Sequence, residues 1–489
     1  MFAKTLGFAF TIVIPLLLVR QLSQEAFGLY KQVFLVVGTS VSMLPLGFGL
    51  SAFYFLPRDE NRRRETVFNI VTFTSTVGAL AWLVLTLFPG LLVALFGDPA
   101  IAPYSRSIGA VIFLWVSGAF LEIVTVANHE VKLATLAIVS MQFTRAAFFV
   151  AAALLAGSIG ALLAAAIAHG VIQLAVLLLY LNSRFPRFWA AFDRSAFGAQ
   201  LAYSLPLGAA GLLYTVQTDL HNYFVSHRFD AATFAVYSVG CFQLPLIGIL
   251  SDSVGSVMIP RVSYLQHHGL AREILLLTAR AVRKLAALFF PLYVLLMVMR
   301  REFIGGLFTS QYLDSVPIFA VNLTLIPLGI LLVDPIIRAY AEHRHFVLRL
   351  QLILLTLLPF ALWFSLGRFG ALGAIAVVVL FNAINRLCQL AKVVRILDVR
   401  AHDLQLFSDV LKIGVAALAA GAVTLPARAV ASGLGPLSSL VVCSTVFSLT
   451  YIASVLVLKI VTVEERGLVV RKAASLVGAS RARVINVAN

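Results

Sequence analysis

Long apolar runs are the feature that most limits what this chain can fold into. A helix needs roughly 20 apolar residues to cross a bilayer, and the chain has about fourteen such runs. They lie at 3–20, 33–57, 67–96, 107–128, 133–156, 159–181, 198–225, 234–258, 285–299, 315–337, 346–366, 370–391, 411–430 and 437–458. Of the 489 residues, 61% are hydrophobic and only 12% are charged. The sequence therefore predicts an all-α, polytopic membrane protein with about fourteen transmembrane helices.

The distribution of positive charge indicates how these helices cross the membrane. Cytoplasmic loops of membrane proteins are enriched in Lys and Arg. Most of the 37 Lys and Arg residues fall in alternate loops, which are the cytoplasmic ones if the N-terminus is cytoplasmic. We therefore expect an even number of helices with both termini in the cytoplasm. The excess of basic over acidic residues then favours contact with anionic membrane lipids and not with nucleic acid.

The segments between the helices exclude several chemical functions. The outside connections are short, the longest being around 300–314, so no external catalytic domain of a glycan polymerase or ligase is present. No phosphate-binding GxxxxGK[ST] loop occurs, which excludes ATP hydrolysis within this chain. Cys241, Cys388 and Cys443 lie in apolar runs without the spacing of metal ligands. The chain is therefore predicted not to be an enzyme and to hold neither metal nor cofactor.

A weak internal repeat divides the chain. "LSQEAFGLYKQV" at 22–33 aligns with "FDAATFAVYSVG" at 229–240, so that Phe27 meets Phe234 and Tyr30 meets Tyr237. Six predicted helices separate the copies, which indicates parallel repeats with a binding site near the membrane midplane between them. The predicted organisation is an N-terminal lobe (1–197), a C-terminal lobe (198–392), two additional helices (393–458) and a basic cytoplasmic tail (459–489).

These junctions resemble those of a known family. "RQLSQEAFGLYKQV" (20–33) resembles the segment after helix 1 in polysaccharide flippases of the multidrug/oligosaccharidyl-lipid/polysaccharide exporter superfamily; its matching residues are Arg20, Leu22, Ser23, Glu25, Phe27, Gly28 and Tyr30. "QTDLHNYFVSHRFDAATFAVYSVG" (217–240) is similar to the helix 7–8 junction of that family, where an Asp is common, here Asp219.

The resemblance implies a function and a location. It implies transport of an oligosaccharide on a polyprenyl diphosphate from the cytoplasmic to the periplasmic leaflet of the bacterial inner membrane. The product would serve synthesis of a surface polysaccharide such as O-antigen (the lipopolysaccharide side chain), capsule or exopolysaccharide. A polysaccharide polymerase and chain-length machinery are the partners that this pathway would supply.

Polar side chains inside the predicted spans form the candidate substrate site. A basic side chain at mid-span costs roughly 2.5–3.5 kcal/mol, and Arg binds phosphate oxygens with two parallel hydrogen bonds. The candidate ligands of the diphosphate and glycan are Arg145, Arg386, His169, Gln142, Asn382, Asn385 and Gln389. In the alternative interpretation, the two arginines pair with Glu122, Asp219 or Asp252 and only join helices.

A second polar group lies in "LLYTVQTDLHNYFVSH" (212–227), near the predicted outer end of the seventh span. We expect Asp219, His221 and Asn222 to act at a gate or in coupling. Asp219 could bind a coupling cation, carry a proton or accept hydrogen bonds from sugar hydroxyls. The alternative is a contact between the lobes without any ligand. The sequence does not distinguish proton, sodium and uncoupled transport.

Other charged groups are predicted to be structural or to lie on the membrane surface. Glu122, Asp252 and Asp334 lie near the ends of predicted spans, and we interpret them as structural. The segments 261–284 and 464–483 are amphipathic and basic, which predicts contact with anionic lipid surfaces. The tail could instead recruit a protein partner.

The predicted mechanism is alternating access by the two lobes, without covalent chemistry. The main alternative is a cation-coupled multidrug exporter of the same superfamily. A peptidoglycan-precursor flippase is a further alternative, although the first two predicted helices lack the interior Arg residues of that group. A membrane glycan polymerase or ligase is disfavoured by the short outside loops. The glycan itself is not predicted.

Overall fold

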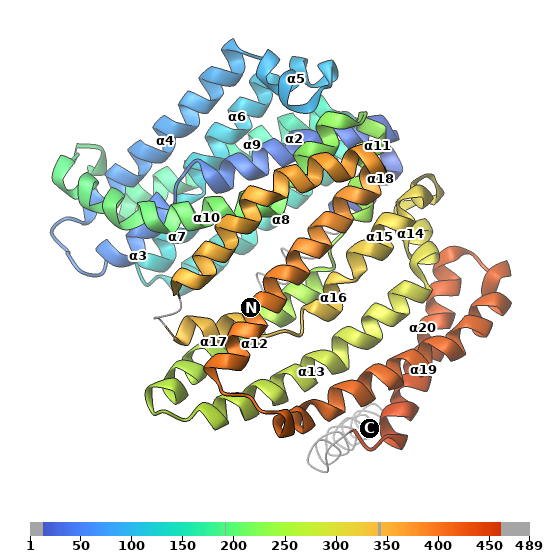
Figure 1. The fold of residues 1–489 in the computed structure, drawn as a ribbon. Coiled ribbons are helices and arrows are strands. Elements are labelled where there is room, and N and C mark those ends of the chain that lie inside the picture. Colours follow the sequence, from blue (N-terminus) through green and yellow to red (C-terminus); the bar gives the residue numbers. More distant parts are fainter. Residues whose placement is uncertain (1–12, 191, 341–343, 461–489) are drawn as a thin grey trace, which may run out of the picture. The chain divides into compact units, whose positions relative to one another are not determined.

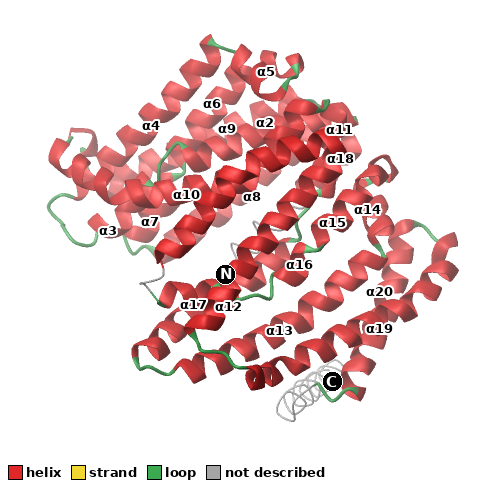
Figure 2. Ribbon diagram, viewed as in Figure 1, coloured by secondary structure: helices red, strands yellow, loops and turns green. Residues whose placement is uncertain are grey.

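The computed structural model describes residues 13–190, 192–340 and 344–460. Across these ranges the chain forms helices joined by short loops, and no strand is drawn in them (Figure 2). Within the same residues, 11 helices are long and apolar enough to cross a membrane. The predicted all-α architecture is therefore confirmed.

The described helices group into two compact units. The first unit comprises Met1–Pro245, Leu307–Asn322 and His345–Asn385. Its helices, shown in Figure 1, are α2 (Gln24–Met43), α3 (Ala52–Phe55), α4 (Arg63–Leu87), α5 (Gly90–Phe96), α6 (Ser105–Gly118), α7 (Phe120–Ala127), α8 (Val131–Leu155), α9 (Ile159–Arg184), α10 (Arg194–Arg228), α11 (Ala231–Gly240), most of α15 (Val316–Leu323) and most of α18 (Arg344–Ile396). Helix α6 packs between α4 and α9, α8 packs on α9, and α2 packs on α10 and α11.

The second unit comprises Leu246–Gly306, Leu323–Arg344 and Arg386–Asn489. Its helices are α12 (Pro245–His267), α13 (Ala271–Val298), most of α14 (Arg300–Phe308), α16 (Leu325–Leu328), α17 (Asp334–Ala339), the end of α18, α19 (Ser408–Val430) and α20 (Pro436–Val457). Helix α19 packs on both α13 and α20. The lobe boundaries proposed from the repeat stay a prediction.

The helix boundaries agree with the predicted runs at one place and differ from them at two. The predicted runs 346–366 and 370–391 correspond to the two helical parts of α18, which meet at a kink where Gly370 adopts φ 59° and ψ −150°, a conformation open to glycine and strained for other residues. The predicted run 234–258 is interrupted between α11 and α12, and the run 315–337 is divided into α15, α16 and α17. Most of the predicted run 3–20 lies outside the described residues.

The predicted surface segment 261–284 is not a separate element. Its first residues complete α12 and the others, from Ala271 onward, begin α13. Helix α13 continues without a break because Leu275, Thr278 and Val282 bury the same face that its apolar half buries. Whether the segment 261–284 meets anionic lipid stays a prediction. The second predicted surface segment, 464–483, lies outside the described residues.

The two repeat-related junctions have the same local structure. Ser23 precedes α2 with φ −64° and ψ 163°, and its hydroxyl accepts a hydrogen bond from Ala26 N. Asp230 precedes α11 with φ −65° and ψ 166°, and its carboxylate accepts one from Thr233 N at 2.8 Å. Hydrogen bonds from Thr233 hold the pKa of the Asp230 carboxyl below its ordinary value. Both side chains satisfy backbone donors that a helix start leaves free.

The two junction helices also contact each other. A Cβ added to Gly28 of α2 would lie 1.8 Å from the carbonyl oxygen of Ala231 in α11. Only a residue without a side chain permits this approach of two backbones. The glycine in the first repeat therefore fixes how the start of α2 packs on the start of α11.

An asparagine supports the interruption between α11 and α12. Backbone carbonyls at a helix end lack intrahelical donors, and such unsatisfied groups are costly inside a membrane. The side-chain amide of Asn322, in α15, donates to Gly240 O at 3.3 Å and to Phe242 O at 3.1 Å. The interruption is therefore held by a side chain from another part of the chain.

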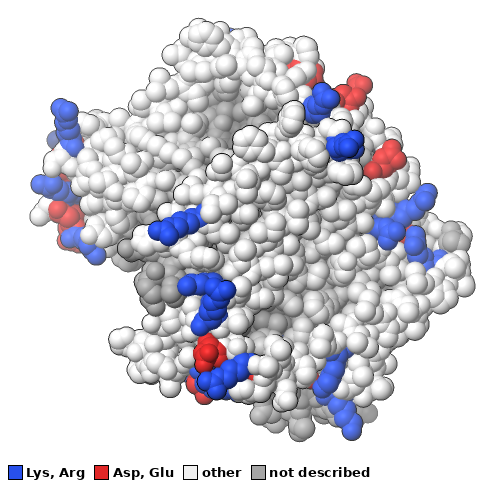
Figure 3. Space-filling model, viewed as in Figure 1, with Lys and Arg blue, Asp and Glu red and all other residues white. Residues whose placement is uncertain are grey.

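The outer surface of the described helices suits a lipid environment. Large apolar side chains are widely exposed; examples are Leu83 on α4, Trp363 on α18 and Leu411 on α19. On the face shown in Figure 3, charged side chains form small separate groups within uncharged surface. Soluble proteins rarely expose so much contiguous apolar surface.

Candidate functional site

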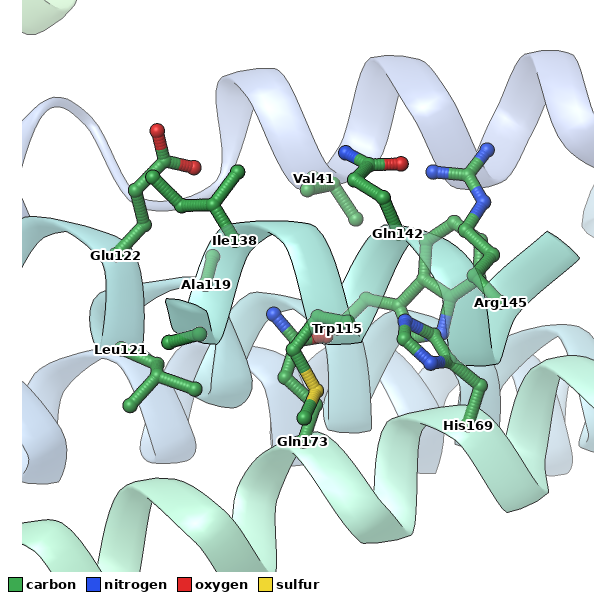
Figure 4. A pocket seen from close by; sticks show the side chains of 12 residues that line it. Val41, Trp115, Ala119, Leu121, Glu122, Ile138, Gln142, Arg145, His169 and Gln173 are labelled. Carbon is green, nitrogen blue, oxygen red and sulfur yellow. The ribbon is translucent and has the colours of Figure 1, made fainter. Parts of the chain in front are cut away.

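A cavity in the first unit contains three of the predicted substrate ligands. It has a volume of about 180 Å³ and lies where α6, α8 and α9 pack together, with Val41 of α2 also on its wall. Helix α8 contributes Gln142 and Arg145, and α9 contributes His169 and Gln173. Figure 4 shows these side chains with Trp115 of α6 around the cavity. The structure thus brings together Gln142, Arg145 and His169 on one cavity, and their contact with a substrate stays a prediction.

The Arg145 guanidinium has no acidic partner among the described residues. Within the described part of the chain, no carboxylate forms an ion pair with Arg145. Its neighbours are rings: the guanidinium carbon lies 4.9 Å from the centroid of Trp115 and 6.0 Å from that of Phe149. Glu122 lines the same cavity without an ion pair. The geometry of the described residues therefore does not support the interpretation in which Arg145 joins helices through an ion pair.

Trp115 holds the arginine in place and is itself fixed. Its indole Nε1–H donates to Ala166 O of α9 at 3.1 Å. The His169 ring meets the indole edge-to-face, with centroids 6.1 Å apart and an interplanar angle of 88°. A guanidinium over an indole face gains roughly 0.5–2 kcal/mol. The tryptophan therefore holds Arg145 at the cavity by a ring contact, where no counter-ion lies among the described residues.

Trp115→Leu is expected to lower transport by about tenfold, because the ring that positions Arg145 is lost. Trp115→Phe keeps a ring but loses the hydrogen bond to Ala166, so an intermediate loss is expected. For the polysaccharide flippase that the resemblance implies, the measurement is the amount of surface polysaccharide in cells with equal amounts of each variant. Trp189→Leu is the matched control, since Trp189 is exposed in a connection outside the cavity. If Trp115→Leu transports as well as the wild type, Trp115 is not needed to position Arg145.

Four predicted substrate ligands on α18 do not line this cavity: Asn382, Asn385, Arg386 and Gln389. Arg386 and Gln389 belong to the second unit, where the Arg386 guanidinium donates to Leu331 O at 3.3 Å. The Asn382 amide donates to Val378 O of its own helix at 2.9 Å. Asn382, Asn385 and Arg386 are half-buried, and Gln389 is buried. Their contact with a substrate stays a prediction.

The predicted gate residues separate into two environments. Asp219 lines a second cavity of the first unit, with a volume of about 910 Å³ and mostly apolar walls that include Leu220, Phe224 and Trp363. His221 is instead buried, with its Nδ1 2.7 Å from the hydroxyl of Tyr237 in α11. Positions two apart on a helix differ in direction by about 200°, which explains the separation.

The Asp219 carboxylate is half-buried and makes no hydrogen bond or ion pair with the described residues. The hydroxyls of Thr39 and Tyr223, both on the wall of this cavity, lie 2.5 Å apart and join α2 to α10. Asn222 is half-buried and does not line the cavity. Asp219 is thus the predicted gate residue with a free carboxylate in a cavity.

Trp115 and Glu122 line the first cavity but were not predicted as site residues. Trp115 lies in an apolar run, where nothing in the sequence distinguishes it from a packing residue. Glu122 was interpreted as structural, although a carboxylate inside a predicted span is a signal for function. Both become site residues only through the packing of α6 and α7 on the same cavity as α8.

Comparison with known proteins gives a family and a fold. The family model described as "Polysaccharide biosynthesis protein" matches residues 17–317. A search of curated protein sequences gives no match. Among solved structures, the lipid II flippase MurJ in an inward closed conformation has a TM-score of 0.72 at 14% identity, covering 93% of this chain and 97% of MurJ.

Two further solved structures have the same fold. An inward-facing multidrug resistance MATE family transporter of the MOP superfamily has a TM-score of 0.63 at 15% identity, covering 80% of this chain and 94% of the other. A MOP superfamily transporter from Pyrococcus furiosus has a TM-score of 0.53 at 14% identity, covering 81% and 93%. The chain therefore has the multi-pass membrane fold shared by MurJ and the MATE transporters.

Proposed function

The chain belongs to the polysaccharide biosynthesis protein family, and from this membership we propose that it is a flippase for polyprenyl-diphosphate-linked oligosaccharide. The proposed direction is from the cytoplasmic to the periplasmic leaflet of a bacterial inner membrane, with both termini in the cytoplasm. The oligosaccharide would serve synthesis of O-antigen, capsule or exopolysaccharide. A polysaccharide polymerase and chain-length machinery are proposed to receive it.

One observation carries this proposal. Arg145 lies near the middle of α8, a helix long and apolar enough to cross a membrane, and its side chain lines a cavity. The guanidinium has no acidic partner among the described residues. A cation at this depth costs roughly 2.5–3.5 kcal/mol. An anionic ligand would offset that cost, and the guanidinium fork binds phosphate oxygens with two parallel hydrogen bonds. A diphosphate is the anionic part of a polyprenyl-linked glycan.

The proposed mechanism needs no covalent step. The cavity takes the diphosphate and the adjoining sugar from the cytoplasmic leaflet while the prenyl chain remains largely in lipid. A change between inward- and outward-open states then presents the glycan to the periplasm. No cofactor is proposed, and whether a proton or sodium ion drives the change is a matter for measurement.

The test is mass spectrometry of polyprenyl-diphosphate intermediates in cells lacking this protein. Build-up of a complete oligosaccharide on its carrier, with loss of surface polysaccharide, is the expected result and identifies the glycan. Build-up of the peptidoglycan precursor instead would reassign the substrate to that of the solved flippase MurJ. Unchanged lipid-linked pools would overturn the proposal.

The Asp219 cavity favours one second candidate, a cation-coupled multidrug exporter. A half-buried, unpaired carboxylate in a large apolar cavity suits a lipophilic cation such as tetraphenylphosphonium. If this candidate is right, Asp219→Asn lowers resistance to tetraphenylphosphonium to the level of cells without the protein. If the flippase proposal is right, the deletion itself leaves that resistance unchanged.

A further inference from the structure

Arg145 lies where two adjoining cavities of opposite character meet. The cavity of about 180 Å³ that contains His169 is here called the polar lobe of the site. It shares Val41, Trp115, Gln142 and Arg145 with a neighbouring cavity of about 340 Å³. This neighbour, here called the aromatic lobe, is otherwise lined by Ile14, Pro15, Tyr30, Phe34, Gly38, Ala146 and Phe149. The guanidinium is thus accessible from both lobes.

The end of the polar lobe away from Arg145 carries side chains that can form hydrogen bonds with a ligand. Glu122 lies beside Ile138 at one end of this lobe, and Arg145 and His169 lie at the other (Figure 4). Seven residues separate Ile138 from Arg145 on α8, which corresponds to about 10 Å along the helix. Glu122 and Gln142 make no hydrogen bond through their side chains within the described residues.

The rest of this wall adds further acceptors. The Gln173 amide nitrogen donates to Gly118 O at 3.3 Å, which leaves its carbonyl oxygen as an acceptor. A carboxylate that faces a cavity accepts strong hydrogen bonds from hydroxyl and amide donors and repels phosphate. This end of the lobe therefore suits a sugar and does not suit the diphosphate.

The aromatic lobe has the opposite preference. Arg145 is its one charged residue among those described. The rings of Tyr30 and Phe34 lie 4.9 Å apart between centroids, and those of Phe34 and Phe149 lie 5.4 Å apart. A continuous ring surface beside an arginine suits an apolar chain that begins at a phosphate.

We propose that this site binds its substrate in one orientation, with the diphosphate at Arg145, the first sugar toward Glu122 and the first prenyl unit toward Phe34. The proposal rests on the flippase function proposed above and adds Glu122 as the residue that recognises the sugar next to the diphosphate. A polyprenyl diphosphate without sugar would occupy the same site without using Glu122.

The test compares probes on the purified full-length protein in nanodiscs by native mass spectrometry. The probes are inorganic diphosphate, undecaprenyl diphosphate, and undecaprenyl diphosphate carrying one hexose or one N-acetylhexosamine. Glu122→Gln is expected to weaken binding of the preferred sugar-bearing lipid by about tenfold and to leave the sugar-free lipid unchanged. Phe34→Ala is expected to weaken both kinds of lipid several-fold and to leave inorganic diphosphate unchanged.

Two further variants separate the possible failures. Glu273→Gln is the matched control, because Glu273 is exposed on α13 outside both lobes. Arg145→Gln is expected to weaken every probe. If it does so while Glu122→Gln affects all lipids alike or none, the proposed orientation is wrong and the flippase proposal stands. If the wild type binds none of the lipids, the proposed function itself fails.

Discussion

Arg145→Ala is expected to lower transport of the lipid-linked oligosaccharide by about 100-fold or more, because the proposed charge contact between the guanidinium and the diphosphate is lost. Arg145→Lys keeps the charge but loses the planar fork, so partial transport is expected. The measurement is the ratio of lipid-linked oligosaccharide to surface polysaccharide in cells that produce each variant. Arg106→Ala is the control, since Arg106 is exposed in the first turn of α6.

The melting temperature of Arg145→Ala shows whether Arg145 binds substrate or stabilises the fold. Within the described residues Arg145 has no ion pair to lose, so its removal relieves the burial of an uncompensated cation. We therefore expect the melting temperature of Arg145→Ala to equal or exceed that of the wild type. A lower melting temperature together with intact transport would show that Arg145 stabilises the fold and does not bind substrate.

Gly28→Ala is expected to have the largest effect on stability. The added methyl group would lie 1.8 Å from the Ala231 carbonyl oxygen, so α2 and α11 must move apart. Overpacking of this kind costs about 1–3 kcal/mol and more where backbone has to shift. A marked fall in the melting temperature and in the yield of membrane-inserted protein is expected.

Gly38→Ala is the matched control on the same helix. A Cβ at Gly38 meets no atom within 4 Å, and alanine favours the helix over glycine by roughly 1 kcal/mol. An unchanged or raised melting temperature is expected there. Equal behaviour of the two variants would show that α2 and α11 do not rely on the close approach at Gly28.

Apolar runs were enough to predict the all-α architecture because a membrane helix satisfies its own backbone hydrogen bonds. They did not reveal the interruption after Gly240, because the residues on both sides are apolar and the bonds that support it come from Asn322. The boundary between the predicted runs 346–366 and 370–391 coincides with the kink that Gly370 makes in α18. Hydropathy shows which residues prefer lipid. It does not show which side chains will satisfy the backbone carbonyls left free where a helix is interrupted.

The candidate site was predicted in part for a similar reason. Gln142 and Arg145 are one turn apart, so spacing alone places them on one helix face. Trp115 and Glu122 reach the same cavity through the packing of α6 and α7, which depends on contacts between helices. His221 was grouped with Asp219 by proximity in sequence, whereas Tyr237 binds it in a different environment.

The position of Asn322 has a consequence for motion. Two of the three points at which the chain passes from the first unit to the second lie after Pro245 and after Asn322. Since the Asn322 amide binds the carbonyls of Gly240 and Phe242, one side chain ties together the segments that lead to these two passages. A movement of either segment therefore acts on the other through this one side chain.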